Sequence, residues 1–94
     1  MPQLTFPREI KIVYDREGCI GAAACAAINP IDWVIDTSDG KANLVESKKE
    51  ENRFVKIVNV ENEDAMQRIV ESAKVCPVSV IEVWDQKENI KLAP

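Results

Sequence analysis

The sequence predicts a small α+β fold in which two helices cover one face of an antiparallel sheet. Two observations support this prediction. Segments with alternating apolar residues lie near both ends of the chain, and helical and hairpin patterns fill the part between them. The order is strand, short helix, hairpin, long helix, strand. We expect the first and last strands to pair, with additional hairpin strands within residues 32–60.

The first predicted strand covers residues 9–15, in which every second residue is apolar or aromatic. A turn at residues 16–18 separates it from a short alanine-rich helix at residues 22–28. This helix ends before Pro30, because proline disfavours helical backbone at the residue that precedes it.

A hairpin is predicted at residues 32–45, where Asp39-Gly40 supplies the turn signal between two short apolar arms. The strongly charged residues 47–52 are predicted to form a loop. Residues 54–60 alternate again and predict an additional strand.

The long helix has the clearest signal in the chain. Asn62 is a plausible N-cap, and acids follow in the first turn, where the helix dipole favours them. The expected apolar stripe consists of Ala65, Met66, Ile69, Val70 and Ala73. Cys76-Pro77 ends the helix, and residues 79–84 form the final strand. We expect the polar tail, residues 86–94, to be flexible.

Length and composition limit the possible functions. The 94 residues suit one domain, 1–94, and the net charge of −4 argues against nucleic acid as a partner. No apolar stretch is long enough for a membrane span, and no secretory signal is recognisable at the start, so we expect a cytoplasmic protein. There is no histidine, which leaves thiolates and carboxylates as metal ligands.

The acidic excess is concentrated in residues 31–64, which contain nine acids and five bases. This stretch is either a solvated loop region or a docking surface for a basic partner.

Three cysteines, Cys19, Cys25 and Cys76, are open to several interpretations. They could be small buried apolar residues, or two of them could form a disulfide, although the odd number and the expected compartment disfavour a structural bridge. A zinc ion would require a fourth ligand from Cys or His. An iron–sulfur cluster held by thiolates is the remaining metal centre.

The neighbours of the cysteines favour a cluster. Its sulfides accept hydrogen bonds from backbone N–H groups, so the chain must approach closely. Gly21 supplies backbone freedom, and the alanines at 22–24 add little bulk. Pro77 is rigid and has no N–H group.

These features together resemble the small bacterial and archaeal ferredoxins that carry a single cubane-type cluster. The resemblance covers residues 8–84 and rests on C-I-G-x-x-x-C, a later proline, the D-G-K hairpin, the amphipathic helix and C-P-V-x-x-I. The family motif is C-x2-C-x2-C-x3-C-P. Cys19 matches its first cysteine and Cys25 its third, Ala22 and Asn29 replace the second and fourth, and Cys76 matches the remote ligand.

The resemblance implies a ferredoxin-like fold and a one-electron carrier that is not an enzyme. Cys19, Cys25 and Cys76 would be the metal ligands, and residues that would contact the cluster are Ile20, Gly21, Ala22, Ala23, Ala24 and Pro77. The apolar wall would also include Ile28, Pro30 and Val78. Residues 46–60 would be an insertion, since this segment is longer than in compact family members.

Because the methyl group of Ala22 cannot bind iron, a [3Fe–4S] cluster is preferred. A [4Fe–4S] cluster with a non-protein ligand on the fourth iron is the alternative. The expected partners are redox proteins, a reductase and an acceptor such as a haem-thiolate monooxygenase or an oxidoreductase complex. A rival hypothesis is a module that has lost its cluster and serves in protein interaction or as a thiol switch.

Overall fold

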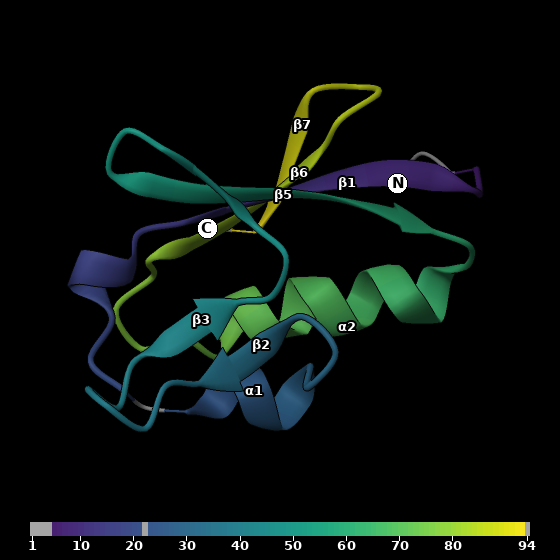
Figure 1. The fold of residues 1–94 in the computed structure, drawn as a ribbon. Helices are drawn as coiled ribbons and strands as arrows, with labels where there is room; N and C mark the ends of the chain where they lie inside the picture. Colours follow the sequence, from purple (N-terminus) through teal and green to yellow (C-terminus); the bar gives the residue numbers. More distant parts are fainter. Residues whose placement is uncertain (1–4, 22, 94) are drawn as a thin grey trace.

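The computed structural model describes residues 5–21 and 23–93, and its main feature is a five-stranded antiparallel sheet (Figure 1). The strand order is β4-β5-β1-β6-β7. The strand bounds are β1 Arg8–Tyr14, β4 Lys48–Glu50, β5 Arg53–Val60, β6 Ile81–Asp85 and β7 Ile90–Ala93. Because β1 pairs with β6, the predicted pairing of the first and last strands is confirmed.

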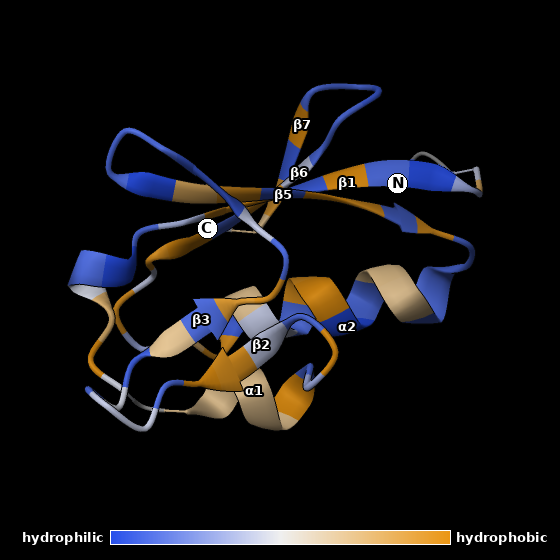
Figure 2. Ribbon diagram, viewed as in Figure 1, coloured by the Kyte–Doolittle hydropathy of each residue, from blue (hydrophilic) through white to orange (hydrophobic). Residues whose placement is uncertain are grey.

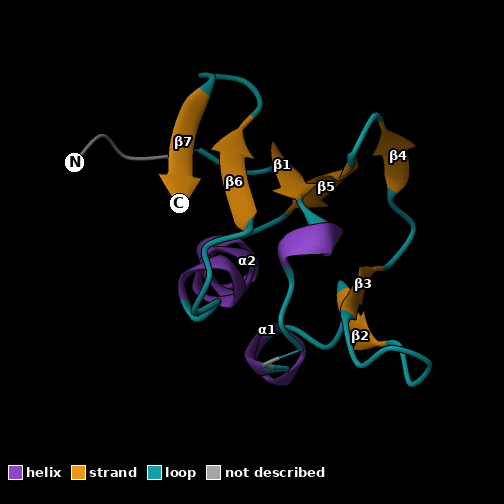
Figure 3. Cartoon of the chain, turned by 90° about the vertical axis from the view of Figure 1, so that its left-hand side faces the viewer, coloured by secondary structure: helices purple, strands orange, loops and turns teal. Residues whose placement is uncertain are grey.

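Both helices lie on the same side of this sheet, as the predicted α+β fold requires (Figures 1 and 3). α2 (Glu63–Lys74) packs against β5, β6 and β7, while α1 (Ala24–Ile28) packs against α2. A second sheet of two strands, β2 (Trp33–Ile35) and β3 (Ala42–Leu44), lies beside α1. A short 3₁₀ helix, η1 (Arg16–Gly18), follows β1.

β1 forms the middle of the sheet, and three of its alternating side chains supply an apolar surface to the core. Ile10, Ile12 and Tyr14 are at most 1% exposed, whereas the residues between them are only partly buried. These three side chains join the core with residues from every layer: Cys25, Trp33, Ala42, Leu44, Val60, Met66, Ile69, Val70, Ala73, Ile81, Val83 and Ala93.

α2 begins where the sequence predicts. The Asn62 side chain caps it by accepting a 2.9 Å hydrogen bond from the backbone N–H of Ala65. Figure 2 shows hydrophilic residues at this end of the helix. The buried face of α2 consists of Met66, Ile69, Val70, Ser72 and Ala73. Of the expected stripe, only Ala65 is partly exposed.

The β2–β3 hairpin is confirmed, and two contacts of Trp33 fix it against the rest of the fold. The indole N–H donates to the Ser72 hydroxyl on α2 at 3.1 Å. The Trp33 ring also meets Tyr14 of β1 edge to face, with ring centroids 4.8 Å apart. The hairpin is therefore held against both the central strand and the long helix.

Two predictions about polar segments are wrong. The expected loop at residues 47–52 contains β4, which pairs with β5 across the Glu51-Asn52 turn. All three β4 side chains are exposed, as on many edge strands, so no apolar alternation signalled it. The expected flexible tail at 86–94 contains β7, which pairs with β6. Within the described part of the chain, no helix is long and apolar enough to cross a membrane.

Candidate functional site

The structure brings the three cysteines to one pocket at the end of the sheet where β1 stops. Cys19 follows η1, Cys25 lies in α1, and Cys76 follows α2. The pocket is open to solvent and is lined by Tyr14, Cys19, Ile20, Ala23, Ala24, Cys25, Cys76, Pro77, Val78, Val80 and Ile81. Three segments distant in sequence thus contribute one thiol each.

This donor set fits a cluster better than a single ion. All three residues are free cysteines, so the structure contains no disulfide between them. Among residues 5–21 and 23–93, no three Cys, Asp or Glu side chains converge closely enough to hold one metal ion. A single zinc ion would require sulfurs only about 3.8 Å apart, given Zn–S bonds of about 2.3 Å. Thiols that line one pocket without converging on a single point suit a group containing several irons.

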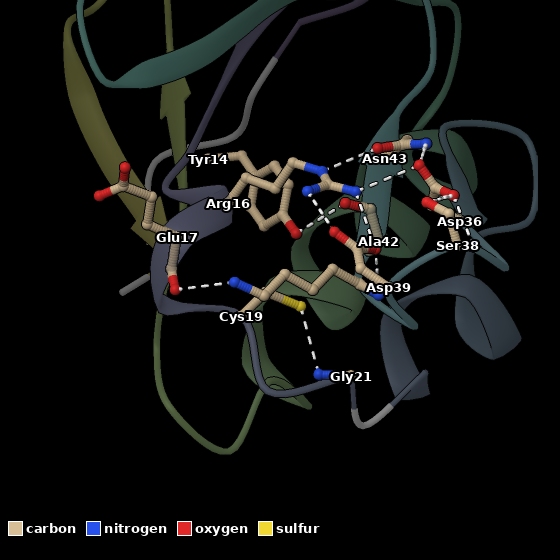
Figure 4. Close-up of polar contacts among 11 residues, drawn as sticks. Tyr14, Arg16, Glu17, Cys19, Gly21, Asp36, Ser38, Asp39, Ala42 and Asn43 are labelled. Carbon is tan, nitrogen blue, oxygen red and sulfur yellow. Dashed lines mark hydrogen bonds and ion pairs between the residues drawn. The ribbon is translucent and has the colours of Figure 1, made fainter.

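The Cys19 sulfur accepts a hydrogen bond from the loop that follows it (Figure 4). The Gly21 N–H donates to its sulfur at 3.5 Å. Burial alone would raise the pKa of this thiol, but the backbone N–H of Ala42, the Tyr14 hydroxyl, the Gly21 N–H and the Lys41 charge together lower it. The surroundings of Cys19 therefore favour the thiolate, which is the form that binds iron.

The Tyr14 hydroxyl lies between Cys19 and the backbone of β3. It donates a 2.8 Å hydrogen bond to the Ala42 carbonyl. Burial raises the pKa of Tyr14 well above its usual range, and the neighbouring Cys19 raises it further. The hydroxyl therefore keeps its single proton, which it can give either to the carbonyl, as here, or to a Cys19 thiolate.

Cys25 shows how closely the three thiols interact. Burial raises the pKa of Cys25, the charges of Cys19 and Cys76 raise it further, and the N–H groups of Ala26 and Cys25 itself act in the opposite direction. Three thiolates in this pocket would repel one another. The positive charge of bound iron would offset that repulsion.

Gly21 holds a position that only glycine can take without strain. Its φ is +75°, and a methyl group there would lie 2.7 Å from the Gly40 carbonyl oxygen. The chain next to Cys19 is therefore in close contact with the β2–β3 turn. Ala23 also has left-handed backbone, with φ of 64°, directly before α1.

The residues predicted to surround a cluster divide between the pocket lining and other places. Its lining includes the predicted Ile20, Ala23, Ala24, Pro77 and Val78. Gly21 contributes its N–H group, and Ala22 lies outside the described residues. The predicted wall residues Ile28 and Pro30 do not line the pocket, because α1 carries them away from it.

Four contributors were missed: Tyr14, Ala42, Val80 and Ile81. For Tyr14 a signal existed, because it is the last inward residue of β1 before Cys19. Ala42 acts through its backbone, so its side chain carries no such signal.

Asn29, which replaces the fourth motif cysteine, does not line the pocket. Its side chain is fully buried and donates a 2.8 Å hydrogen bond to Asp32. Asp32 in turn accepts from Lys56 of β5 at 2.6 Å. Asn29 thus links the end of α1 to the sheet.

The acids of residues 31–64 do not form one surface. Asp36 and Asp39 pair with Arg16, and Asp32 pairs with Lys56. The other acids divide between the two ends of β5, with Glu46, Glu50 and Glu51 before it and Glu61, Glu63 and Asp64 after it. Any docking surface for a basic partner would therefore use only a part of this acidic segment.

Comparisons with known proteins agree with the chemistry of the pocket. No match is found among curated proteins. The model of a family described as "4Fe-4S single cluster domain" matches residues 12–83. That range contains Cys19, Cys25 and Cys76 and all of the pocket lining. The chain therefore belongs to the family of 4Fe-4S single cluster domains and is a small, ferredoxin-like iron–sulfur protein.

Proposed function

We propose that the protein is a one-electron carrier, not an enzyme, whose cluster is bound by Cys19, Cys25 and Cys76. One observation carries this proposal: three thiols from separate segments line a single pocket whose other walls are almost entirely apolar. When bound, the cluster supplies the one-electron chemistry, and the protein sets its binding, its potential and its access to partners.

A [3Fe–4S] cluster is the form that we propose. Three cysteines supply three ligands, and Ala22 stands where the family motif has its second cysteine. The matching family is described by a 4Fe-4S cluster, so the alternative is a [4Fe–4S] cluster whose fourth iron has a non-protein ligand.

The residues of this chain perform three tasks around the proposed cluster. The N–H groups of Gly21 and Ala42 stabilise negative charge on the Cys19 sulfur, and the Tyr14 hydroxyl can add to this when it turns from the Ala42 carbonyl to the thiolate. Apolar side chains of the pocket, such as Ile20 and Val78, limit the access of water. Ile20 is 65% and Val78 is 39% exposed, so part of each side chain is also available for contact with a partner.

The proposed partners are a reductase and an acceptor, such as a haem-thiolate monooxygenase or an oxidoreductase complex, in the cytoplasm. Redox encounters are usually small and short-lived. If the acidic residues steer a basic reductase, the rate of reduction decreases as salt increases, because exposed charges are screened. A rate independent of salt would exclude steering by residues 31–64.

Electron paramagnetic resonance of anaerobically purified protein tests the proposal. We expect the oxidised protein to give a [3Fe–4S] signal, and we expect each Cys→Ser variant at the three positions to lose it. An iron-containing protein without this signal would favour the [4Fe–4S] alternative. A colourless protein without iron would instead support the rival interaction module or thiol switch.

A further inference from the structure

Arg16 is the centre of a hydrogen-bond network that joins η1 to the β2–β3 hairpin (Figure 4). Its Nε donates to the Asn43 side chain at 2.8 Å. Its two terminal nitrogens contact the carboxylates of Asp39, at 2.8 and 3.1 Å, and Asp36, at 3.3 Å. One guanidinium thus contacts three side chains of the hairpin.

The hairpin turn that Arg16 contacts is well ordered by its own hydrogen bonds. Asp36 accepts from both the hydroxyl and the N–H of Ser38, at 2.6 and 2.9 Å. The Lys41 N–H donates to Asp39 at 3.0 Å. These hydrogen bonds connect the two sides of the turn, residues 36–41, so contact with Arg16 positions all of it.

The position of the turn determines which backbone groups of β3 face Cys19. Ala42 pairs with Ile35, next to the backbone hydrogen bond from Asp36 to Lys41. Bonded and non-bonded pairs alternate in an antiparallel ladder, so both backbone groups of Ala42 point away from β2. Its carbonyl accepts from Tyr14, and its N–H points to the same side of β3, where it favours the Cys19 thiolate.

The same turn brings a positive charge close to the pocket. The Lys41 ammonium donates to the Glu17 carbonyl at 3.2 Å, which fixes it two residues before Cys19. The Gly40 carbonyl lies against Gly21, so the turn also contacts the loop after Cys19. Arg16 itself does not line the pocket.

We propose that Arg16 is a positioning residue for electron transfer, which sets the reduction potential of the cluster by holding the β2–β3 turn against the Cys19 loop. This inference rests on the proposed function. Donors and positive charge beside a ligating sulfur stabilise the reduced, more negative cluster. Loosening the turn withdraws the Ala42 N–H and Lys41 from Cys19, so the potential becomes more negative.

Two variants test this without changing the net charge. Arg16→Lys keeps the charge but lacks the planar fork that contacts three side chains. Asn43→Ala removes the neutral acceptor of the Arg16 Nε. Redox titration of the cluster-loaded protein should show a lower reduction potential for Arg16→Lys. We expect the one-electron equilibrium to shift about tenfold toward the oxidised form, which corresponds to a potential about 59 mV more negative. We expect Asn43→Ala to shift the potential in the same direction by a smaller amount.

Arg68→Lys is the matched control, because Arg68 is exposed on α2 and forms no ion pair with the described residues. Its potential should equal that of the parent protein. Hydrogen exchange provides a second measurement that needs no cluster. In both Arg16→Lys and Asn43→Ala, peptides covering residues 36–44 should exchange faster, while those covering α2 remain protected.

Three results would overturn the proposal. One is a reduction potential equal to that of the parent protein for both Arg16→Lys and Asn43→Ala at full iron content. Another is unchanged exchange at residues 36–44 in these variants. The third is a shift for Arg16→Gln together with a parent-like Arg16→Lys, which would assign the effect to charge alone. A parent protein that binds no iron would refute the proposed function itself, and its iron content distinguishes that failure from the other three.

Discussion

Two arginines near opposite ends of β1 pair with acids, but their surroundings differ. Arg8, where β1 begins, is 6% exposed and pairs with the fully buried Asp85 of β6. Arg16, just after β1, has a side chain 23% exposed and pairs with two acids of the hairpin turn. The strand places them roughly 20 Å apart. The Arg8–Asp85 pair is buried, whereas the two ion pairs of Arg16 lie on the surface beside the cysteine pocket.

Because of this difference, we expect the two ends of β1 to serve different purposes, one for the stability of the fold and the other for function. Removing one partner of a buried ion pair costs about 3–5 kcal/mol, because a charge remains buried without a partner. An exposed pair contributes about 0–1 kcal/mol. We therefore expect Arg8 to matter for folding, and Arg16 to act mainly on the geometry of the pocket.

The largest expected effect comes from the pocket itself. Cys76→Ser should remove the cluster, and with it a stabilisation on the order of several kcal/mol, because metal binding and folding are coupled. Thermal unfolding and iron content of the variant should match those of the parent protein stripped of iron, which is the control. A variant that lacks iron but unfolds at the temperature of the loaded parent would show that the cluster does not support the fold.

The buried ion pair should rank second. Arg8→Gln leaves the Asp85 carboxylate buried without its partner and should lower the free energy of unfolding by about 3 kcal/mol. Denaturant unfolding measures this loss, and Arg8→Gln with Asp85→Asn should recover most of it. The reduction potential should stay unchanged, because the pair lies at the far end of β1. A shifted potential would show that the two ends are coupled.

Two glycines at the pocket end allow a matched comparison. Gly21 and Gly40 share a φ of +75°, but a methyl group at Gly40 meets nothing within 4 Å. Gly40→Ala should therefore cost only the strain of left-handed backbone, about 1–2 kcal/mol. Gly21→Ala should cost more and shift the potential, because its methyl group displaces the Gly40 carbonyl. Equal losses of stability in denaturant unfolding would contradict the contact between the loop and the turn.

The smallest expected effect is a pH dependence of stability that comes from the hairpin turn beside Arg16. Hydrogen bonds from the Ser38 hydroxyl and N–H, then from Asn43, lower the pKa of Asp36 to about 2. Since its ordinary pKa is 3.8, ionised Asp36 favours the folded state above that value. This contribution is lost as pH falls toward 2.

A carboxyl ¹³C titration measures this pKa directly. We expect Ser38→Ala to raise it toward 4, while Ser47→Ala, whose hydroxyl donates elsewhere, leaves it unchanged. A parent value near 4 would show that the turn does not hold Asp36 as described.

The elements that could be predicted from the sequence are those in which apolar residues recur with a regular spacing. β1 and α2 were predicted correctly because Ile10, Ile12 and Met66 mark faces that must be buried. β4 and β7 were missed because pairing, and not burial of an alternating face, makes them strands. Backbone hydrogen bonding to a neighbour leaves no such pattern in the sequence.

The candidate site divides in the same way. The thiols and small residues that line the pocket could be singled out from the sequence, because their chemistry depends on side chains. The contribution of Ala42 was missed because a backbone N–H has no residue signature, and that of Arg16 because its partners lie 20 or more positions along the chain. Only the register of β2 and β3 brings these groups to Cys19.

The central claim is that Cys19, Cys25 and Cys76 together hold one cluster, and a count of iron and inorganic sulfide per chain tests it most directly. On anaerobically purified protein, we predict close to three irons and four sulfides, and loss of both in each Cys→Ser variant. No iron in the parent protein, or full iron in any one of these variants, would contradict the claim.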